Sequence, residues 1–247
     1  MKIEMENRLA VVTGASSGIG LALCRLLLQA GGRVLAFSRT RGGLAELLAV
    51  YPEQLVWQAG DVTSAEDLQG LAQRAAALGP VDILVPCAGH VELASALDLA
   101  AQDRQWATNG AGALNTLAVL ANQLSPQASV VFLGSFLARC TFSGLAGYIA
   151  GKSALAAQVR NLAVEFAPLQ VRINMVSPGP TATGFWERLG LHDDDLDRLA
   201  EQVGRRLLPG HFLDATQVAK VILFQLSEGA RGVYGQDWVV DNGYTLG

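Results

Sequence analysis

Charged side chains are scarce in this sequence: Asp, Glu, Lys and Arg make up 16% of its 247 residues, and the formal net charge is −4. The longest basic cluster is Arg205-Arg206, so the sequence lacks the positive surface that nucleic-acid-binding proteins carry. It also lacks a run of 18 apolar residues, and its polar N-terminus has no apolar signal-peptide core. We therefore expect a cytoplasmic protein that binds neither nucleic acid nor membranes.

Cysteine and histidine are equally rare, with three of each. The cysteines are far apart and odd in number, which is typical of reduced thiols rather than of a disulfide framework. The histidines show no ligand spacing such as His-Glu-x-x-His. We expect neither a disulfide nor a metal site.

Apolar residues, by contrast, are abundant at 51%. This proportion predicts a large core and a surface partly covered in an oligomer. The length suits one α/β domain, and no repeat, low-complexity linker or composition break divides the chain.

Short runs rich in Val, Ile and Leu alternate with helical patterns along the chain. The runs that predict strands lie at 9–12, 34–37, 55–59, 82–85, 129–133, 171–176 and 238–240. The helical patterns lie at 19–30, 65–78, 98–124, 148–167 and 215–226. Uninterrupted apolar strands between helices indicate a parallel sheet with helices on both faces. We predict a single doubly wound (Rossmann) α/β domain, 1–247, with seven strands.

The least regular stretch, 185–212, predicts a helical flap over a site. Its acidic segment HDDDLD (192–197) fits a solvated helix start better than an acidic binding patch. In such sheets ligands bind beyond the carboxyl ends of the strands, so chemistry is expected in the loops that follow them.

After the first strand comes TGASSGIG, 13–20, which opens a helix. Glycines in such a turn allow the backbone to approach a pyrophosphate, which lies at the helix N-terminus. The spacing is Gly-x-x-x-Gly-x-Gly rather than Gly-x-Gly-x-x-Gly. The residues expected to hold a dinucleotide here are Gly14, Ser16, Ser17, Gly18, Ile19 and Gly20.

The second strand ends in Ser38, Arg39 and Thr40, with no acidic residue. An acid at this turn selects NAD through the ribose 2′-hydroxyl, whereas an Arg accommodates the 2′-phosphate of NADP. We therefore favour NADP(H) over NAD(H), although loop arginines can also be merely exposed.

The next two strands are followed by GDVT (60–63) and PCAGH (86–90). Ala88 and Gly89 would let a cofactor lie against bare backbone, and Asp61 can also cap the helix that follows. Asp61, Val62, Cys87, Ala88 and Gly89 complete this part of the expected cofactor site.

Tyr148 and Lys152 are four residues apart, so on a helix their side chains share one face. The Lys152 ammonium, together with the positive nicotinamide of an oxidised complex, favours phenolate and is expected to lower the pKa of the Tyr148 phenol, which suits an acid-base residue. Ser135 ends the fifth strand thirteen residues earlier, and SPGPTAT, 177–183, ends the sixth.

Together these motifs resemble the short-chain dehydrogenase/reductase family over essentially the whole chain, with likeness to NADP(H)-dependent carbonyl and 3-oxoacyl reductases. The resemblance implies that Ser135 stabilises charge on the carbonyl oxygen and that Lys152 also holds the nicotinamide ribose. It implies that Asn109 interrupts its helix and seats a water that relays protons to Lys152. It further places Pro178, Gly179, Thr181 and Thr183 against the cofactor, and predicts a homodimer or homotetramer that pairs the helices at 98–124 and 148–167.

One departure concerns the turn after the fourth strand, where Pro86 and Cys87 stand in place of the family's two asparagines. The change weakens the case for a rigid turn more than the case for cofactor binding. Cys87 near a cofactor also suggests sensitivity to thiol reagents.

The resulting hypothesis is an enzyme that interconverts a ketone or 3-oxo compound and a secondary alcohol. Ser135, Leu137, Tyr148, Phe185 and Trp186 are the expected substrate contacts, although the last two are as consistent with packing. The alternatives are a non-catalytic dinucleotide-binding regulator and a dehydratase or epimerase on the same scaffold. The sequence leaves open the substrate, the direction and the product stereochemistry.

Overall fold

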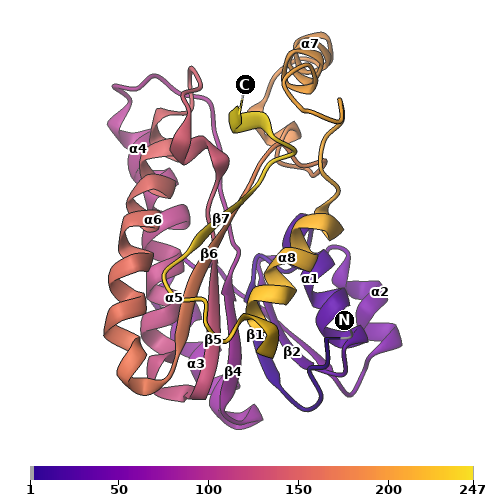
Figure 1. The fold of residues 1–247 in the computed structure, drawn as a ribbon, viewed down its shortest axis with the longest axis vertical. Coiled ribbons are helices and arrows are strands. Elements are labelled where there is room, and N and C mark those ends of the chain that lie inside the picture. Colours follow the sequence, from indigo (N-terminus) through magenta and orange to yellow (C-terminus); the bar gives the residue numbers. More distant parts are fainter. Residues whose placement is uncertain (1–2, 247) are drawn as a thin grey trace.

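The computed structural model describes residues 3–246, which fold around one parallel sheet of seven strands (Figure 1). The strands are β1 Leu9–Thr13, β2 Arg33–Ser38, β3 Leu55–Ala59, β4 Val81–Pro86, β5 Leu124–Leu133, β6 Arg172–Pro178 and β7 Asp237–Val240. They lie in the order β3-β2-β1-β4-β5-β6-β7, and every neighbouring pair is parallel. The predicted doubly wound fold with seven strands is confirmed.

Helices cover both faces of the sheet (Figure 1). The helices are α1 Gly18–Gln29, α2 Leu44–Val50, α3 Ala65–Leu78, α4 Leu99–Trp106, α5 Ala113–Leu120, α6 Ala146–Phe166, α7 Asp193–Gly204 and α8 Ala215–Leu226. One apolar core lies between the sheet and α1, α2 and α8, and a second lies between the sheet and α3, α5 and α6. Because both faces are covered, strands β1 and β6 are buried at every residue, which explains their continuous apolar sequences.

Local sequence sets the starts of several helices. Ser64 accepts a hydrogen bond from the backbone N–H of Asp67 and caps α3. Asp214 and Gln217 form a capping box at the start of α8. These signals explain why the predicted bounds 65–78 and 215–226 agree with the structure.

The helix predicted at 98–124 is not continuous. It consists of α4, a π-helical turn at Ala107–Gly112, α5 and a short 3₁₀ turn, and the last predicted residue, Leu124, already belongs to β5. A π turn contains an extra residue and commonly marks a functional position. The extra turn lies around Asn109.

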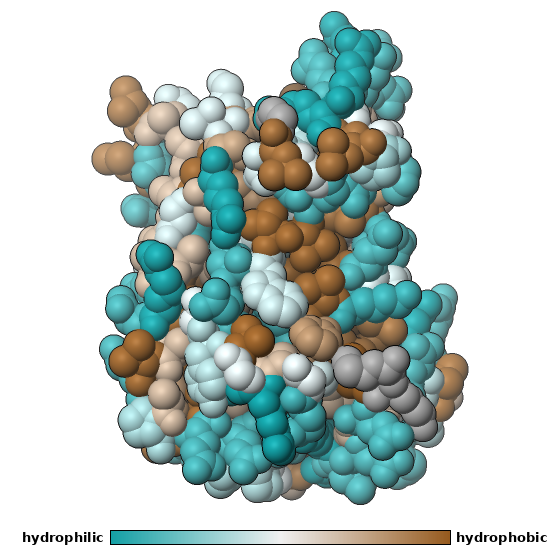
Figure 2. Space-filling view, viewed as in Figure 1, coloured by the Kyte–Doolittle hydropathy of each residue, from teal (hydrophilic) through white to brown (hydrophobic). Residues whose placement is uncertain are grey.

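The predicted flap is a segment with a 3₁₀ turn at Glu187–Leu189 and helix α7, which stands above the end of the sheet near the C-terminus (Figure 1). Its apolar side chains join a third core cluster that includes Tyr148 and Tyr244. Figure 2 shows apolar side chains gathered in the hollow below α7. Among residues 3–246, none of the helices combines the length and apolar character that crossing a bilayer requires.

Candidate active site

A cavity of about 600 Å³ opens at the carboxyl ends of the strands. It is lined by the loops after β1, β2, β3, β4, β5 and β6 together with α6 and the flap. Except for Asn109, every residue assigned to the site from sequence lines this one cavity. Gly14 and Trp186, 172 positions apart in sequence, therefore line the same cavity.

The glycine-rich loop forms one end of the cavity. Gly14 has a φ of +64°, and a Cβ on it would lie 2.7 Å from the Cα of Ala88, so only glycine fits between the β1 and β4 loops. The N-cap residue Ser17 makes no side-chain hydrogen bond to the first turn of α1, and that turn carries no acidic residue. The helix therefore presents free N–H groups and its positive dipole end to the cavity, which suits a pyrophosphate.

The side chains after β2 differ in their surroundings. Ser38 is buried and donates to the Thr40 carbonyl at 2.8 Å, so its hydroxyl holds the turn. The guanidinium of Arg41 lies over the Trp57 ring, 4.8 Å from its centroid, whereas Arg39 is exposed at the rim of the cavity. Arg39 is therefore the arginine available to a phosphate.

Asp61 lies opposite, at the end of β3. Partial burial would raise the pKa of its carboxyl, but hydrogen bonds from the Thr63 N–H and hydroxyl, at 2.9 and 2.8 Å, and the charge of Arg39 outweigh this and lower the pKa overall. Asp61 is thus a permanent anion at neutral pH. It caps its own turn rather than helix α3, which Ser64 caps.

The unusual turn after β4 is held by Thr13. Its hydroxyl oxygen accepts hydrogen bonds from the backbone N–H groups of Cys87 and Ala88, at 3.1 and 3.2 Å. The turn is thereby fixed to β1 without the asparagines that Pro86 and Cys87 replace. Cys87 is only 8% exposed, and burial raises the pKa of its thiol to about 12. The thiol is therefore protonated at neutral pH, which lowers its reactivity, and its sensitivity to thiol reagents stays a prediction.

Ser135, Tyr148 and Lys152 are all buried and meet in the middle of the cavity. Ser135 caps a short 3₁₀ turn by accepting from the Leu137 N–H at 3.2 Å. Lys152 donates from Nζ to the Leu133 carbonyl oxygen at 2.7 Å, and its Nζ lies 5.9 Å from the centroid of the Tyr148 ring. The predicted juxtaposition on one face of α6 is thus observed.

Burial has the largest effect on the pKa values of Tyr148 and Lys152. Burial raises the pKa of the phenol to about 12, and a hydrogen bond with Ser135 offsets this only in part. Burial also lowers the pKa of the Lys152 ammonium to about 8. Desolvation is therefore the largest influence on the pKa of both groups, and the lower Tyr148 pKa expected beside an oxidised nicotinamide stays a prediction. Tyr148 is fully protonated at neutral pH.

Asn109 lies outside the cavity lining, in the π-helical turn. Its side-chain amide donates to the carbonyl oxygen of His90 at 2.7 Å, and its Oδ1 accepts from the His90 N–H at 3.0 Å. The amide therefore fixes the loop that follows β4. The helix interruption implied at this residue is present, and the side chain is engaged by that loop.

The loop after β6 joins the glycine-rich loop to the flap. The Thr181 hydroxyl donates to the Gly179 carbonyl at 2.9 Å, and the indole N–H of Trp186 donates to the Thr181 carbonyl at 2.8 Å. Thr183 approaches Gly18, where an added Cβ would lie 3.3 Å from its methyl group. Thr183 is thereby placed against the start of α1, and the expected cofactor contacts of Pro178, Gly179, Thr181 and Thr183 stay a prediction.

The far end of the cavity is apolar. Phe185 lies edge-on to Tyr148, with ring centroids 5.6 Å apart, and Trp186 packs on Phe185. The lining of the cavity also includes residues that the sequence had not singled out: His90, Val91, Thr108, Phe136, Phe142, Leu145, Arg188, Leu189, Val203 and Tyr244. Tyr244 is the last residue of GQDWVVDNGY, 235–244, whose resemblance to the closing strand and turn of short-chain dehydrogenases/reductases was a usable signal.

Comparison with known proteins gives a consistent picture. A family model described as enoyl-(acyl carrier protein) reductase matches residues 14–245. The chain is 29% identical to pig carbonyl reductase [NADPH] 2, over 99% of each chain. It is 32% identical to 2,3-dihydro-2,3-dihydroxybenzoate dehydrogenase of Escherichia coli, over 99% of this chain and 100% of that protein.

Among solved structures, a short-chain dehydrogenase/reductase from Brucella melitensis, described as glucose/ribitol dehydrogenase, superposes with a TM-score of 0.91. It is 29% identical and covers 99% of both chains. The likeness therefore extends from the glycine-rich loop through the flap to the last strand.

Proposed function

Because this chain belongs to the short-chain dehydrogenase/reductase family, we propose that it uses NADP(H) to interconvert a ketone and a secondary alcohol. The observation that carries the proposal is the meeting of Ser135, Tyr148 and Lys152 in the cavity that the glycine-rich loop opens. A dinucleotide fits this cavity, because the Gly14 turn leaves room for backbone contact and the first turn of α1 is uncapped. When bound, a reduced nicotinamide supplies the hydride that adds to the carbonyl carbon.

Tyr148 supplies the proton in this proposal. Its raised pKa keeps the phenol protonated at neutral pH, so its hydroxyl can donate a proton to the carbonyl oxygen as the oxygen gains charge. Ser135 donates a hydrogen bond to the same oxygen and stabilises that charge. The product alcohol gains one hydride at carbon and one proton at oxygen, and Tyr148 is left as a phenolate.

Lys152 stabilises that phenolate. Its ammonium, held by the Leu133 carbonyl, is the buried cation nearest the phenol ring, 5.9 Å from its centroid. Attraction between two opposite charges is strong where water is excluded. Lys152 is therefore assigned to the proton-transfer step, and Asn109 to positioning the loop of His90 beside it.

Two observations support NADP(H) as the preferred cofactor. Arg39 is exposed at the rim beside the loop after β2, where no carboxylate occupies the turn. The name of the pig relative also specifies NADPH. The test compares kcat/KM for NADPH and NADH in the wild type and in Arg39→Gln, with Arg41→Gln as the control because Arg41 is stacked on Trp57. Only Arg39→Gln is expected to weaken NADPH use, and equal use of both cofactors by the wild type would contradict the preference.

The lining next to Tyr148 indicates the substrate class. Phe136, Leu137, Leu145, Phe185 and Leu189 form an apolar wall around the phenol. We assign a small or medium apolar ketone or 3-oxo compound, whose carbon skeleton would remove this wall from water.

The decisive experiment is Tyr148→Phe, with Tyr51→Phe as the control because Tyr51 lies outside the cavity. Ketone reduction is measured by cofactor oxidation and by product analysis. The Tyr148 variant should lose about 10²- to 10⁴-fold in kcat while it still binds cofactor. Near-wild-type turnover would overturn the acid assignment, and cofactor binding without turnover by the wild type on any ketone would favour a regulator instead.

The proposal includes a homodimer or homotetramer formed through α4, α5 and α6. Leu99 on α4 is 69% exposed and Val164 on α6 is 75% exposed, so this layer carries apolar side chains that an interface would cover. Light scattering should give a mass at least twice 26.0 kDa. A monomer at micromolar concentration would contradict this part.

A further inference from the structure

Three arginines converge at the amino end of the sheet, opposite the cofactor cavity. Arg8 precedes β1, Arg172 is the first residue of β6, and Arg231 follows α8. A groove of about 290 Å³ lies among them. Its other lining residues are Gln127, Gln170, Glu228 and Tyr234. We call it the arginine groove.

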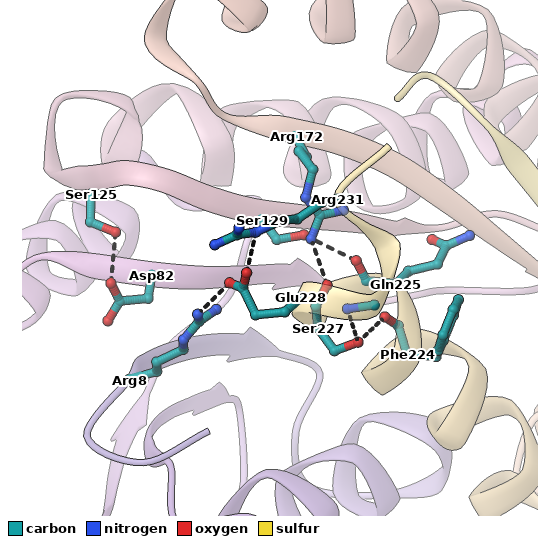
Figure 3. Close-up of polar contacts among 11 residues, drawn as sticks. Arg8, Asp82, Ser125, Ser129, Arg172, Phe224, Gln225, Ser227, Glu228 and Arg231 are labelled. Carbon is teal, nitrogen blue, oxygen red and sulfur yellow. Dashed lines mark hydrogen bonds and ion pairs between the residues drawn. The ribbon is translucent and has the colours of Figure 1, made fainter. Parts of the chain in front are cut away.

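The groove carries an excess of positive charge. Glu228 pairs with Arg8, whose Nη2 lies 2.7 Å from Oε1, and its other oxygen pairs with Arg231 (Figure 3). The single carboxylate is therefore shared by two arginines, and within residues 3–246 Arg172 forms no ion pair with it. Among the lining residues the groove keeps an excess of two positive charges.

Arg172 is the unusual member of the set. It is only 6% exposed, and its Nη2 donates to the Ser227 carbonyl at 3.3 Å (Figure 3). Its Nη1 has no hydrogen-bond partner within residues 3–246. Burial lowers the pKa of Arg172, Tyr234 and Glu228 offset this only in part, and the charges of Arg8 and Arg231 act in the same direction as burial. A buried guanidinium with an unused donor beside two like charges is unfavourable unless an anion joins it.

We propose that the arginine groove binds a small oxyanion with two negative charges: inorganic phosphate or the phosphate group of a phosphomonoester. Guanidinium groups match phosphate oxygens in geometry and charge. Two negative charges would balance the excess in the groove. The amides of Gln127 and Gln170 and the hydroxyl of Tyr234 supply further donors at its edge.

This site is separate from the cofactor site. Arg172 and Pro178 are the two ends of β6, and Pro178 lines the cofactor cavity. Six residue steps along a strand span about 20 Å. The inference therefore does not depend on the proposed function.

The test is calorimetric titration of inorganic phosphate into the protein saturated with NADP⁺ at low salt, so that the cofactor's own phosphate positions are filled. Saturable binding is expected in the wild type. Arg231→Gln should weaken it by about tenfold, whereas Glu228→Gln should tighten it, because the first removes and the second adds net positive charge. Arg74→Gln, an exposed arginine on α3 outside the groove, is the matched control and should bind like the wild type.

The two groove variants separate binding from folding. If both changes shift phosphate affinity in the same direction, or if the wild type shows no saturable binding, the proposal is wrong. Acetate binding as tightly as phosphate would also overturn it, since the site is assigned to a dianion. A parallel titration with glycerol phosphate identifies the source: binding equal to that of phosphate indicates a phosphomonoester, and no binding indicates the free ion.

Discussion

Lys152 and Arg172 are two buried cations at opposite ends of the same sheet. Lys152 is 3% exposed and donates to the Leu133 carbonyl at 2.7 Å, while Arg172 is 6% exposed and donates to the Ser227 carbonyl at 3.3 Å. Neither forms an ion pair with a carboxylate within residues 3–246. Both cations are therefore buried and held by a backbone carbonyl, but burial affects the protonation of the two side chains differently.

The difference is whether the charge can be lost. Burial lowers the pKa of Lys152 to about 8, so its proton is exchangeable in a range that enzymes use. A guanidinium remains protonated at any pH at which proteins are folded. A buried lysine therefore suits a step in which a proton moves, and a buried arginine suits a site that holds an anion permanently.

The substitution with the largest expected effect is Lys152→Met, which removes the cation that can lose its proton. We expect kcat/KM to fall by about 10²- to 10⁴-fold, because the phenolate of Tyr148 loses its nearest cation. We also expect the variant to be more stable than the wild type at neutral pH by about 1–2 kcal/mol. Burial lowers the pKa of Lys152, which means that folding with the ammonium charged costs free energy, and Met carries no charge. The loss of the hydrogen bond to the Leu133 carbonyl offsets part of this gain.

The pH dependence of the stability difference between the wild type and Lys152→Met checks the sign of this effect. Because the pKa of Lys152 in the folded protein lies below the ordinary lysine value of 10.5, the stability of the wild type should rise between about pH 8 and pH 10.5 relative to that of the variant. Thermal denaturation at several pH values measures it. A variant less stable than the wild type at neutral pH would show that the buried ammonium is not a cost to folding.

A smaller effect is expected in the pH profile of the wild type. The rate of ketone reduction should fall above about pH 8, by about tenfold per pH unit, as Lys152 loses its proton. Tyr148, whose pKa is about 12, stays protonated throughout this range. Phosphate affinity at the arginine groove should stay constant between pH 8 and pH 10. A profile that is flat to pH 10 would remove Lys152 from the proton-transfer step.

The smallest expected effect comes from Arg172→Lys. A lysine at this position keeps the charge but loses the planar fork, so phosphate affinity should fall by about three- to fivefold. Burial should also lower the pKa of the new ammonium, so that binding weakens with rising pH, unlike in the wild type. Calorimetry at pH 7 and pH 9 measures both changes. An affinity independent of pH would mean that the arginine groove does not desolvate the charge.

Much of the fold follows from the sequence because both faces of the sheet are buried. The strands appear as apolar runs, and Ser64 and Asp214 mark the starts of α3 and α8. Helix α2 was missed because it has only seven residues and follows two glycines, which are typical of a loop. The strand order depends on contacts between distant segments and is not encoded in any local pattern.

The site was predictable where chemistry requires a residue type. Glycine in the tight turn and the phenol, amine and hydroxyl of the catalytic group are recognised by identity and spacing. The apolar wall was not, because Leu145 and Val203 have the same composition as any core residue. The rise that burial causes in the pKa of Tyr148 was not predictable either, since spacing shows which groups are neighbours but not how thoroughly water is excluded from them.

The π turn at Ala107–Gly112 sets the phase between two helices that lie end to end. One residue of an α-helix corresponds to about 100° of rotation. An extra residue would rotate α5 by that amount if the winding stayed α-helical, but the wider π turn absorbs it, so Leu117 and Leu120 remain buried on α5. The segment therefore accommodates one additional residue around Asn109 without rotating one helix relative to the other.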